Sequence, residues 1–535
     1  MKPNSVTQKI NAGAGSDVSD LHVSLPLRQE DNIGTLSPFV HKFQTQKNKY
    51  VFDINTGRIV KVDAIIWDII DDFGKRSKDE IVREFSSRYK TSEICSAYDE
   101  IACAREHNKS FLATRPKQIV LPSEEKVRES INHESAWVVL QVTEDCNCRC
   151  RYCVYEDRYG TWGKRSKRRM EWEVARLAID DFLEHCDYYN SLAETGGIAF
   201  YGGEPLLNFP LIKQCVEYVR KKVENDPPFH ITTNGSLLRG EIADFSASER
   251  FYICVSLDGP AHIHDHCRIF RDGSGTWKVV IENIEEFLEK YPEYKTNGKL
   301  SLNVVLSPFG SAVAVEEFFS SFELFSTIKI EIETVILTNS ELFDFLSPKN
   351  RRIPDIDMLY QKFLRNLASG AINKDPNNKM WCIQRGYYEN KFRLFHNRDV
   401  AQPGKILSGQ VGPRGTCIPG VVNPYVTVDG NYYPCEKFHL NEECRIGDVW
   451  QRRKSSKIHN MIMQFYRFNS TQCASCWCIR NCNIGCYIYS IKAGKLSEEA
   501  KRKRCEKYRH DMHDTLVDYC EIQEQNPHAF EYLKE

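Results

Sequence analysis

The sequence predicts an α/β fold in which a parallel sheet curls into a full or partial barrel, flanked by a small α+β domain and a cysteine-rich module. Three observations lead to this prediction. Strand-like and helix-like segments alternate from about residue 135 to residue 345. Short polar motifs follow the first four of these strands directly, and cysteine is concentrated in two clusters rather than spread along the chain.

Length and charge limit the class of protein. A chain of 535 residues is too long for one hydrophobic core, so several domains are expected. The 72 basic and 73 acidic residues nearly cancel, which gives no general attraction to nucleic acid or to an anionic membrane. No run approaches the ~18 apolar residues that cross a bilayer, and the polar N-terminus has no signal-peptide core. We therefore expect a cytoplasmic protein with no nucleic-acid or membrane partner.

The first part of the chain predicts a tail and a small domain. Residues 1–33 are rich in Ser, Gly, Asn and Asp and are expected to be flexible. Within residues 34–118, two strand-like runs flank the turn Asn55-Thr56-Gly57, and three segments with helical spacing follow at 64–73, 78–89 and 92–107. This pattern predicts a compact α+β domain of winged-helix-like type.

Residues 135–345 carry the predicted barrel. Because parallel strands need crossover connections and these are right-handed, six strands with intervening helices imply a partial (β/α)6 barrel. Chemistry in such barrels lies at the C-terminal ends of the strands. The motifs CNCRCRYC, YGGEP, TTNGS and SLDGP follow successive strands, so they are expected on one face. The expected strands cover 136–143, 196–201, 229–234, 251–257, 299–307 and 328–337.

The remaining chain divides into three parts. Residues 346–416 are less regular and are expected to bridge the barrel and the C-terminal module. Residues 417–510 lack long apolar runs and are dense in cysteine, so metal ligands would supply much of their folding energy. Residues 511–535 are expected to form a C-terminal helix or tail.

The first cysteine cluster lies in EDCNCRCRYCVYE, from Glu144 to Glu156. A tetrahedral zinc site usually has two separated pairs of ligands, whereas only one, one and two residues separate these four cysteines. Three of them, with three and then two intervening residues, can present thiolates to three corners of an iron–sulfur cluster. These are Cys146, Cys150 and Cys153, and Cys148 is left over.

This CNxxCxYC motif after the first strand of an α/β barrel resembles that of the radical S-adenosylmethionine (SAM) superfamily. Four further motifs agree in order: YGGEP at 201–205, TNG at 233–235, SLDG at 256–259, and HDxxR…GxGTW at 264–277, which is similar to the subgroup acting on peptides and proteins. The resemblance implies a [4Fe–4S] cluster with one open iron that SAM chelates, and a 5′-deoxyadenosyl radical as the reactive species.

The resemblance also implies roles for single residues. Glu204 would receive the methionine amino group, and Arg268 would pair with a SAM oxygen. Tyr152 and Ser256 would contact the adenosine or the ribose. The full set of implied SAM-site residues is Tyr152, Gly202, Gly203, Glu204, Asn234, Ser256, Asp258, Arg268 and Leu337.

The second group of cysteines contains Cys417, Cys435, Cys473, Cys476, Cys482, Cys486 and Cys505. Their spacing resembles that of the seven-cysteine SPASM module, which carries two auxiliary [4Fe–4S] clusters. By that resemblance Cys473, Cys476, Cys482 and Cys505 would enclose one cluster. The other would be held by Cys417, Cys435 and Cys486, with Cys382, Cys444 or an open iron in fourth place. Three clusters are therefore expected in all. A zinc ribbon is the alternative for residues 473–486.

Glu436 follows Cys435 directly and is a candidate catalytic base. Sulfatase-maturating relatives have an aspartate at the matching place, so the glutamate is a departure that weakens the case for their reaction. A simple ion pair with Lys437 is the alternative.

The domain at 34–118 resembles the PqqD-like peptide-recognition domain of peptide maturases, in which a leader peptide would add a strand to an exposed sheet edge. Together the resemblances imply a radical SAM oxidoreductase that matures a ribosomally made precursor peptide and takes electrons from a donor such as flavodoxin or ferredoxin. Thioether (C–S) crosslinking is the first expectation, with C–C crosslinking, epimerisation and backbone cleavage open. Formylglycine formation in a sulfatase is a rival. A non-catalytic iron–sulfur electron carrier is a different class, which the SAM-site motifs disfavour.

Overall fold

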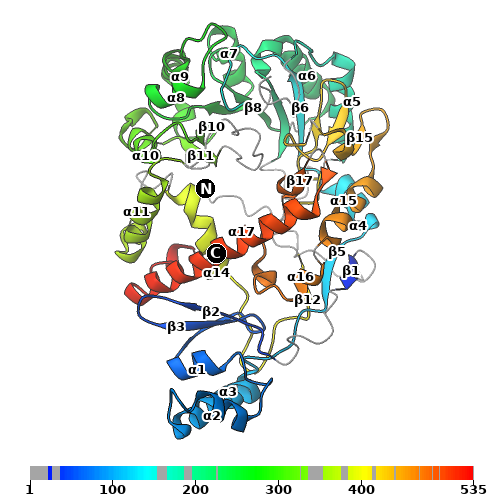
Figure 1. The fold of residues 1–535 in the computed structure, drawn as a ribbon. Coiled ribbons are helices and arrows are strands. Elements are labelled where there is room, and N and C mark those ends of the chain that lie inside the picture. Colours follow the sequence, from blue (N-terminus) through cyan, green and yellow to red (C-terminus); the bar gives the residue numbers. More distant parts are fainter. Residues whose placement is uncertain are drawn as a thin grey trace.

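The chain was analysed as a computed structural model, shown as a ribbon in Figure 1. Among the described residues, no helix combines the length and apolar character needed to cross a membrane. The structure describes residues 22–26, 37–153, 166–185, 196–224, 227–325, 327–334, 353–374, 384–412, 417–438, 441–468, 470–484, 486–492 and 495–533.

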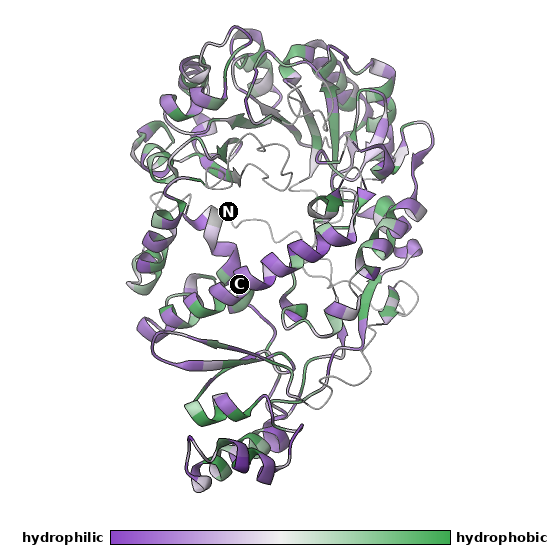
Figure 2. Ribbon diagram, viewed as in Figure 1, coloured by the Kyte–Doolittle hydropathy of each residue, from purple (hydrophilic) through white to green (hydrophobic). Residues whose placement is uncertain are grey.

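Six parallel strands form the barrel sheet, and all six lie where the sequence predicts them. They are arranged in sequence order, each hydrogen-bonded to the next. Their apolar runs fill a continuous core, which Figure 2 shows as green strands. The strands are β6 (Trp137–Thr143), β7 (Gly197–Gly202), β8 (Phe229–Thr233), β9 (Tyr252–Ser256), β10 (Leu300–Leu306) and β11 (Lys329–Thr334).

Helices between these strands cover the outside of the sheet (Figure 1). Amphipathic spacing turns one side of each toward the core, as in α9, where Val280, Ile284 and Phe287 are buried. The helices are α5 (Trp172–His185), α6 (Phe209–Lys222), α7 (Gly240–Ser248), α8 (Ala261–Cys267), α9 (Trp277–Lys290) and α10 (Ala312–Ser321).

The barrel sheet continues into the cysteine-rich module, which the sequence did not predict. Strand β13 (Tyr425–Val426) pairs in parallel with β6, and three short antiparallel strands follow it to make a ten-stranded sheet. These are β14 (Asn431–Tyr433), β15 (Gly447–Asp448) and β16 (Arg452–Arg453). The described sheet is open, with β11 and β16 at its two ends.

The N-terminal domain has a sheet and three helices with their own apolar core. Strands β2 (Val40–Gln44), β3 (Lys49–Asp53) and β4 (Arg58–Val62) form an antiparallel sheet in that order. The helices are α1 (Ala64–Ile69), α2 (Lys78–Phe85) and α3 (Thr91–Asn108). A buried Asp53 organises the turn after β3, accepting from the Asn55 amide at 3.0 Å, the Thr56 hydroxyl at 2.8 Å and the Phe111 amide at 3.1 Å.

A connecting layer lies between this domain and the barrel. Strand β5 (Gln118–Pro122) and helix α4 (Glu124–His133) join the two, and α4 packs on α15 (Ser455–Arg467). The bridge predicted at 346–416 contains the expected helix α11 (Ile356–Ala368), together with α12 (Ala371–Lys374), a π-helical turn (Arg385–Glu389), α14 (Asn390–His396) and β12 (Gln410–Val411). The rest of the module contains α16 (Ser470–Ala474), β17 (Ile491–Lys492) and β18 (Lys495–Leu496).

Two predicted boundaries need correction. Strand β1 (His22–Pro26) lies within the expected tail at 1–33, where its pairing with β5 buries Leu25. Helix α17 (Glu498–Gln525) crosses the boundary predicted at 510 without a break. Its mixed polar sequence gives no signal for an end there, and tertiary packing carries it on between the barrel and the N-terminal domain (Figure 1).

Candidate functional site

The first cysteine cluster forms a loop immediately after β6. Its backbone is fastened to residues 267–271: the Arg149 amide donates to the Ile269 carbonyl at 2.6 Å and the Arg151 amide to the Cys267 carbonyl at 2.9 Å. Arg271 closes the loop from outside, because it pairs with Asp145 and donates to the Cys146 carbonyl at 2.8 Å. Main-chain and side-chain contacts from residues 267–271 therefore hold the loop in place.

All four cysteines of this loop lie close together. Cys148 and Cys150 are buried, whereas Cys146 and Cys153 are partly exposed. The Cys148 amide donates to the Cys146 sulfur at 3.4 Å. Burial raises the pKa of the Cys150 thiol to about 12, opposed by the nearby Arg268 cation. A thiolate here needs a positive partner, which the iron of a cluster would provide.

Gly202 and Gly203 are required by the loop itself. A Cβ on Gly202 would lie 2.2 Å from the Thr143 carbonyl oxygen, and one on Gly203 would lie 2.1 Å from that of Asp145. The Gly203 amide also donates to the Thr143 carbonyl at 2.9 Å. Both glycines were expected among the SAM-site residues, a role that stays a prediction; in the structure the cysteine loop approaches them closely.

Glu204 is fully buried at the centre of the site. Its carboxylate accepts from the Thr233 hydroxyl at 2.7 Å, the Asn234 amide at 2.7 Å and the Leu206 amide at 3.1 Å. Burial, reinforced by the charge of Cys146, raises the pKa of Glu204 to about 7. Glu204 thus joins the ends of β7 and β8, and a role in receiving the SAM amino group stays a prediction.

Asn234 connects the end of β8 to the cysteine loop. Its amide nitrogen donates to the Asn147 oxygen at 2.8 Å and to the Cys148 sulfur at 3.2 Å. Asn147 in turn donates to the Ser236 hydroxyl at 2.8 Å. Sequence reasoning missed Asn147 and Ser236, although Asn147 lies within the CNxxCxYC motif that drew attention to the cysteines.

Tyr152, Asp258 and Arg268 form one buried cluster. The Tyr152 hydroxyl donates to Asp258, and Arg268 Nε donates to the same carboxylate at 2.9 Å. The other Asp258 oxygen accepts from the Val305 amide at 3.1 Å. Three predicted residues are therefore brought together, but Arg268 Nε faces Asp258, and its pairing with a SAM oxygen stays a prediction. Ser256 is buried at the end of β9, and Leu337 lies outside the described residues.

The HDxxR…GxGTW motif supports this cluster from behind. His264 Nδ1 accepts from the Asp258 amide at 3.2 Å, so its Nε2 carries the proton toward Thr276 at 2.9 Å. Burial lowers the pKa of His264 to about 4, which keeps this neutral tautomer. A Cβ on Gly275 would overlap the Asp265 carboxylate, which accepts from the Trp277 amide at 2.8 Å.

The structure brings the seven predicted auxiliary cysteines into two sets. In the first, Cys473 and Cys482 both lie close enough to Cys476 and Cys505 for their charges to interact. In the second, Cys417 and Cys435 each interact with Cys486, and Glu436 and Lys437 face the same three sulfurs. This grouping is the one that the SPASM resemblance implies, and the role of these sulfurs as cluster ligands stays a prediction.

The candidates for a fourth ligand of the second set are placed differently. Cys444 is buried, and its sulfur accepts from the Asn441 side chain at 3.0 Å. Cys382 lies outside the described residues. Cys478 had no predicted role. Its buried thiol is hydrogen-bonded to Cys476 and lies beside the first set.

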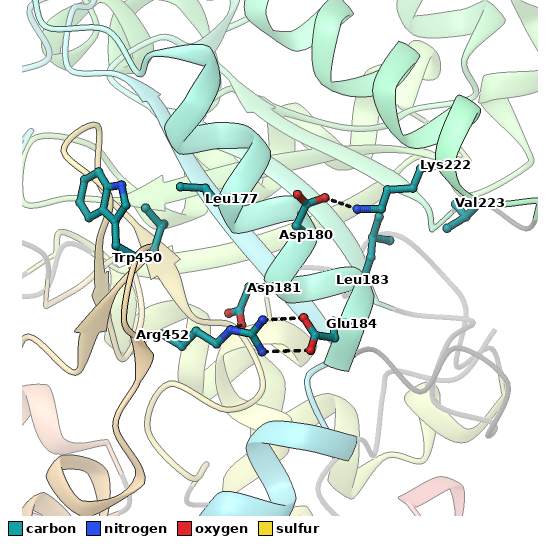
Figure 3. A pocket seen from close by; sticks show the side chains of 10 residues that line it. Leu177, Asp180, Asp181, Leu183, Glu184, Lys222, Val223, Trp450 and Arg452 are labelled. Carbon is teal, nitrogen blue, oxygen red and sulfur yellow. Dashed lines mark hydrogen bonds and ion pairs between the residues drawn. The ribbon is translucent and has the colours of Figure 1, made fainter.

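A pocket of about 690 Å³ lies elsewhere, between α5 and the β15–β16 hairpin (Figure 3). Its charged groups pair with one another: Arg452 with Glu184 at 2.6 Å, and Lys222 with Asp180. No residue among those that line it belongs to the predicted site. The pocket is therefore separate from the cysteine loop.

Comparison with known proteins identifies the barrel. A family model described as the radical SAM superfamily matches residues 140–305. The chain is 25% identical over 361 residues to the cysteine-type anaerobic sulfatase-maturating enzyme of Clostridium perfringens, covering 65% of this chain and 88% of that protein. It is 25% identical over 285 residues to the radical SAM cyclopropyl synthase TigE of Paramaledivibacter caminithermalis, covering 51% and 57%.

Among solved structures, Streptococcus suis SuiB bound to its precursor peptide SuiA has a TM-score of 0.43 at 13% identity, covering 87% of this chain and 97% of SuiB. At this identity and TM-score the likeness is distant. The family match and the two enzyme relatives agree with the strand-end motifs around the cysteine loop. Residues 140–305 are therefore a radical SAM domain, and the chain is a radical SAM enzyme.

Proposed function

We propose that this enzyme modifies a ribosomally made precursor peptide, by hydrogen abstraction followed by thioether (C–S) crosslinking. The observation that carries the proposal is the meeting of three strand ends, where the Cys146 loop, Glu204 and Asn234 lie within hydrogen-bonding reach of one another. Cys146, Cys150 and Cys153 would hold a [4Fe–4S] cluster there. Bound with SAM, that cluster would supply the 5′-deoxyadenosyl radical that removes a hydrogen atom from the peptide.

Two auxiliary clusters would complete the oxidation. Crosslinking removes two hydrogens from the peptide: one leaves as the abstracted atom and one as the thiol proton. One electron is then left over, and the cysteine sets of the C-terminal module would accept it. The accounting requires one electron acceptor, and two cysteine sets that each hold a cluster would bring the total to three [4Fe–4S] clusters, or about twelve iron atoms per chain.

The N-terminal domain would bind the leader of the precursor. Strand β2 faces α17, with the Thr45 hydroxyl donating to Glu524 at 2.8 Å, whereas β4 forms the other end of the described sheet. The leader would therefore add as a strand along β4, between Arg58 and Val62. Main-chain hydrogen bonds would give affinity there.

Formylglycine formation is the second candidate. The relative from Clostridium perfringens, named as a sulfatase-maturating enzyme and matched over 88% of its length, favours it. Glu436 would then be the base, close to Cys417, Cys435 and Cys486. A non-catalytic electron carrier is disfavoured because it has no use for the SAM-site motifs.

One experiment separates these functions. The anaerobically reconstituted enzyme is given dithionite and SAM, and 5′-deoxyadenosine is measured; its absence would refute the enzyme's radical chemistry. The enzyme is then offered a cysteine-containing precursor from a neighbouring reading frame and, separately, a sulfatase peptide. Loss of two hydrogens with loss of a free thiol in the precursor supports crosslinking. An aldehyde in the sulfatase peptide alone would overturn it.

A further inference from the structure

Helix α17 turns three residues of one face toward the first set of auxiliary cysteines. Lys501, Cys505 and Arg509 are spaced by four, so they lie in a row along the helix. Tyr508 fastens this part of the helix to the segment between Cys478 and Cys482, since its hydroxyl donates to the Asn481 carbonyl at 2.7 Å. The two cations therefore keep fixed positions on either side of a cluster ligand.

Lys501 is buried, with 4% of its surface exposed. Its ammonium donates to the Phe465 carbonyl and lies 4.1 Å from the centre of the Phe465 ring. Its charge interacts with Cys473, Cys482 and Cys505. A buried cation is costly unless it is paired, and the thiolates of a cluster would be its anionic partners.

Arg509 acts on the same set from the next turns of the helix. It hydrogen-bonds to Cys476 and also lies close to Cys473. Arg509 is thus a second cation beside the cysteines of this set.

The other set has a different charge environment. Glu436 faces Cys417, Cys435 and Cys486, so its negative charge opposes the cations Lys437 and Arg504. The charges that act on Cys473 are those of the cations Lys501 and Arg509 and of the neighbouring cysteines Cys476 and Cys505. An added electron would be stabilised more beside Lys501 and Arg509 than beside Glu436.

We propose that Lys501 and Arg509 raise the reduction potential of the cluster held by Cys473, Cys476, Cys482 and Cys505 above that of the cluster held by Cys417, Cys435 and Cys486. The proposal rests on the proposed function, in which both sets hold [4Fe–4S] clusters. Reduction adds one electron and one negative charge to a cluster, and a fixed cation in a buried setting stabilises that form. Lys501 and Arg509 act through the cluster rather than on the substrate.

The test is a potentiometric titration of the reconstituted full chain, followed by electron paramagnetic resonance. Lys501→Met removes the charge and keeps the length of the side chain, and Lys501→Arg keeps the charge. Lys507→Met is the matched control, because Lys507 is 66% exposed on the same helix. We expect Lys501→Met to lower the reduction constant of the highest-potential cluster about tenfold, about 59 mV for one electron. Lys501→Arg should restore most of it, and Lys507→Met should leave it unchanged.

Three results would overturn the proposal. The first is that the reduction potential of the highest-potential cluster stays unchanged in both Lys501→Met and Arg509→Gln, while both variants keep their full iron content. Another is an equal shift in Lys507→Met. The third is loss of one cluster's iron from Lys501→Met, which would make the residue purely structural. An iron content of about four atoms per chain in the wild-type enzyme would instead refute the proposed function, which requires three clusters.

Discussion

Cys148 is one thiol more than the radical SAM loop needs. We expect Cys148→Ala to keep the first cluster and SAM cleavage, because the proposed ligands are Cys146, Cys150 and Cys153. Cys150→Ala should abolish both. Both side chains are buried, so the pair is matched for the cost of truncation. Iron content and 5′-deoxyadenosine production measure the outcome, and equal behaviour of the two variants would contradict the chosen ligand register.

Gly203 tests whether the glycines support the loop. A Cβ there meets the Asp145 carbonyl carbon at 2.6 Å as well as its oxygen, so Gly203→Ala should displace the loop and destabilise the domain by about 1–3 kcal/mol. Gly409→Ala is the control, since a Cβ at Gly409 meets nothing within 4 Å. Thermal unfolding and cluster loading would measure the effect. Equal unfolding temperatures and loading in the two variants would count against this role.

Spacing along the sequence was enough to predict which cysteines lie close together, because neighbouring ligands of a cluster are close in the chain; their role as cluster ligands stays a prediction. Spacing did not reveal that Arg268 Nε donates to Asp258, because both residues were expected among the SAM contacts. Both residues stood in recognised motifs, but the choice between a ligand oxygen and a carboxylate depends on tertiary geometry. Asn147 and Ser236 were missed for the same reason.

At the scale of elements, His41 on β2 contacts the cysteine-rich module through Trp477 and helix α17 through His513. The His41 ring stacks on Trp477 with 3.7 Å between centroids, and its Nε2 lies 2.9 Å from Nδ1 of His513. Burial, and then the charge of His513, lowers the pKa of His41 to about 3. The native contact therefore requires a neutral His41.

This contact predicts an acid-sensitive interface. The pKa of His41 is about 3 when folded and about 6.5 in an unfolded chain, so the unfolded state binds more protons between these values. The stabilisation is complete above pH ~6.5 and is lost as the pH falls toward 3. Limited proteolysis between residues 109 and 117 should therefore accelerate at pH 5.5. His41→Phe should reduce that acceleration, and an unchanged pH dependence would exclude His41.

The six barrel strands were predictable because each has strand-like apolar spacing between helical segments, and polar motifs directly follow the first four. Strands β13–β16 were not, since each has only two or three residues and depends on pairing with β6 or with one another. β1 was missed because five residues in a polar segment carry little pattern until β5 is beside them.

At the scale of the whole molecule, the N-terminal domain has its own core, while the cysteine-rich module is expected to draw stability from its ligands. Hydrogen–deuterium exchange should therefore show strong protection gained on cluster reconstitution in residues 470–505. Protection should also rise in β2, through Trp477, but not in α2 or α3. Equal changes across the N-terminal domain would contradict this division.

The boundary predicted at 510 falls inside helix α17. Helix α17 belongs at once to the cysteine module, through Cys505, and to the N-terminal domain, through Glu524, which accepts from Tyr50 at 2.9 Å. A boundary drawn by cysteine density could not detect a polar helix that serves both.

The pairing of β13 with β6 has a consequence for electron flow. The Val139 amide donates to the Pro424 carbonyl at 3.0 Å, so the strand preceding the radical SAM loop and the strand entering the cysteine module belong to one sheet. A shared sheet leaves no hinge between them. If clusters occupy the auxiliary sites as proposed, the tunnelling distance to them from the barrel mouth would be set by this sheet, and peptides of different length would have to adjust to it.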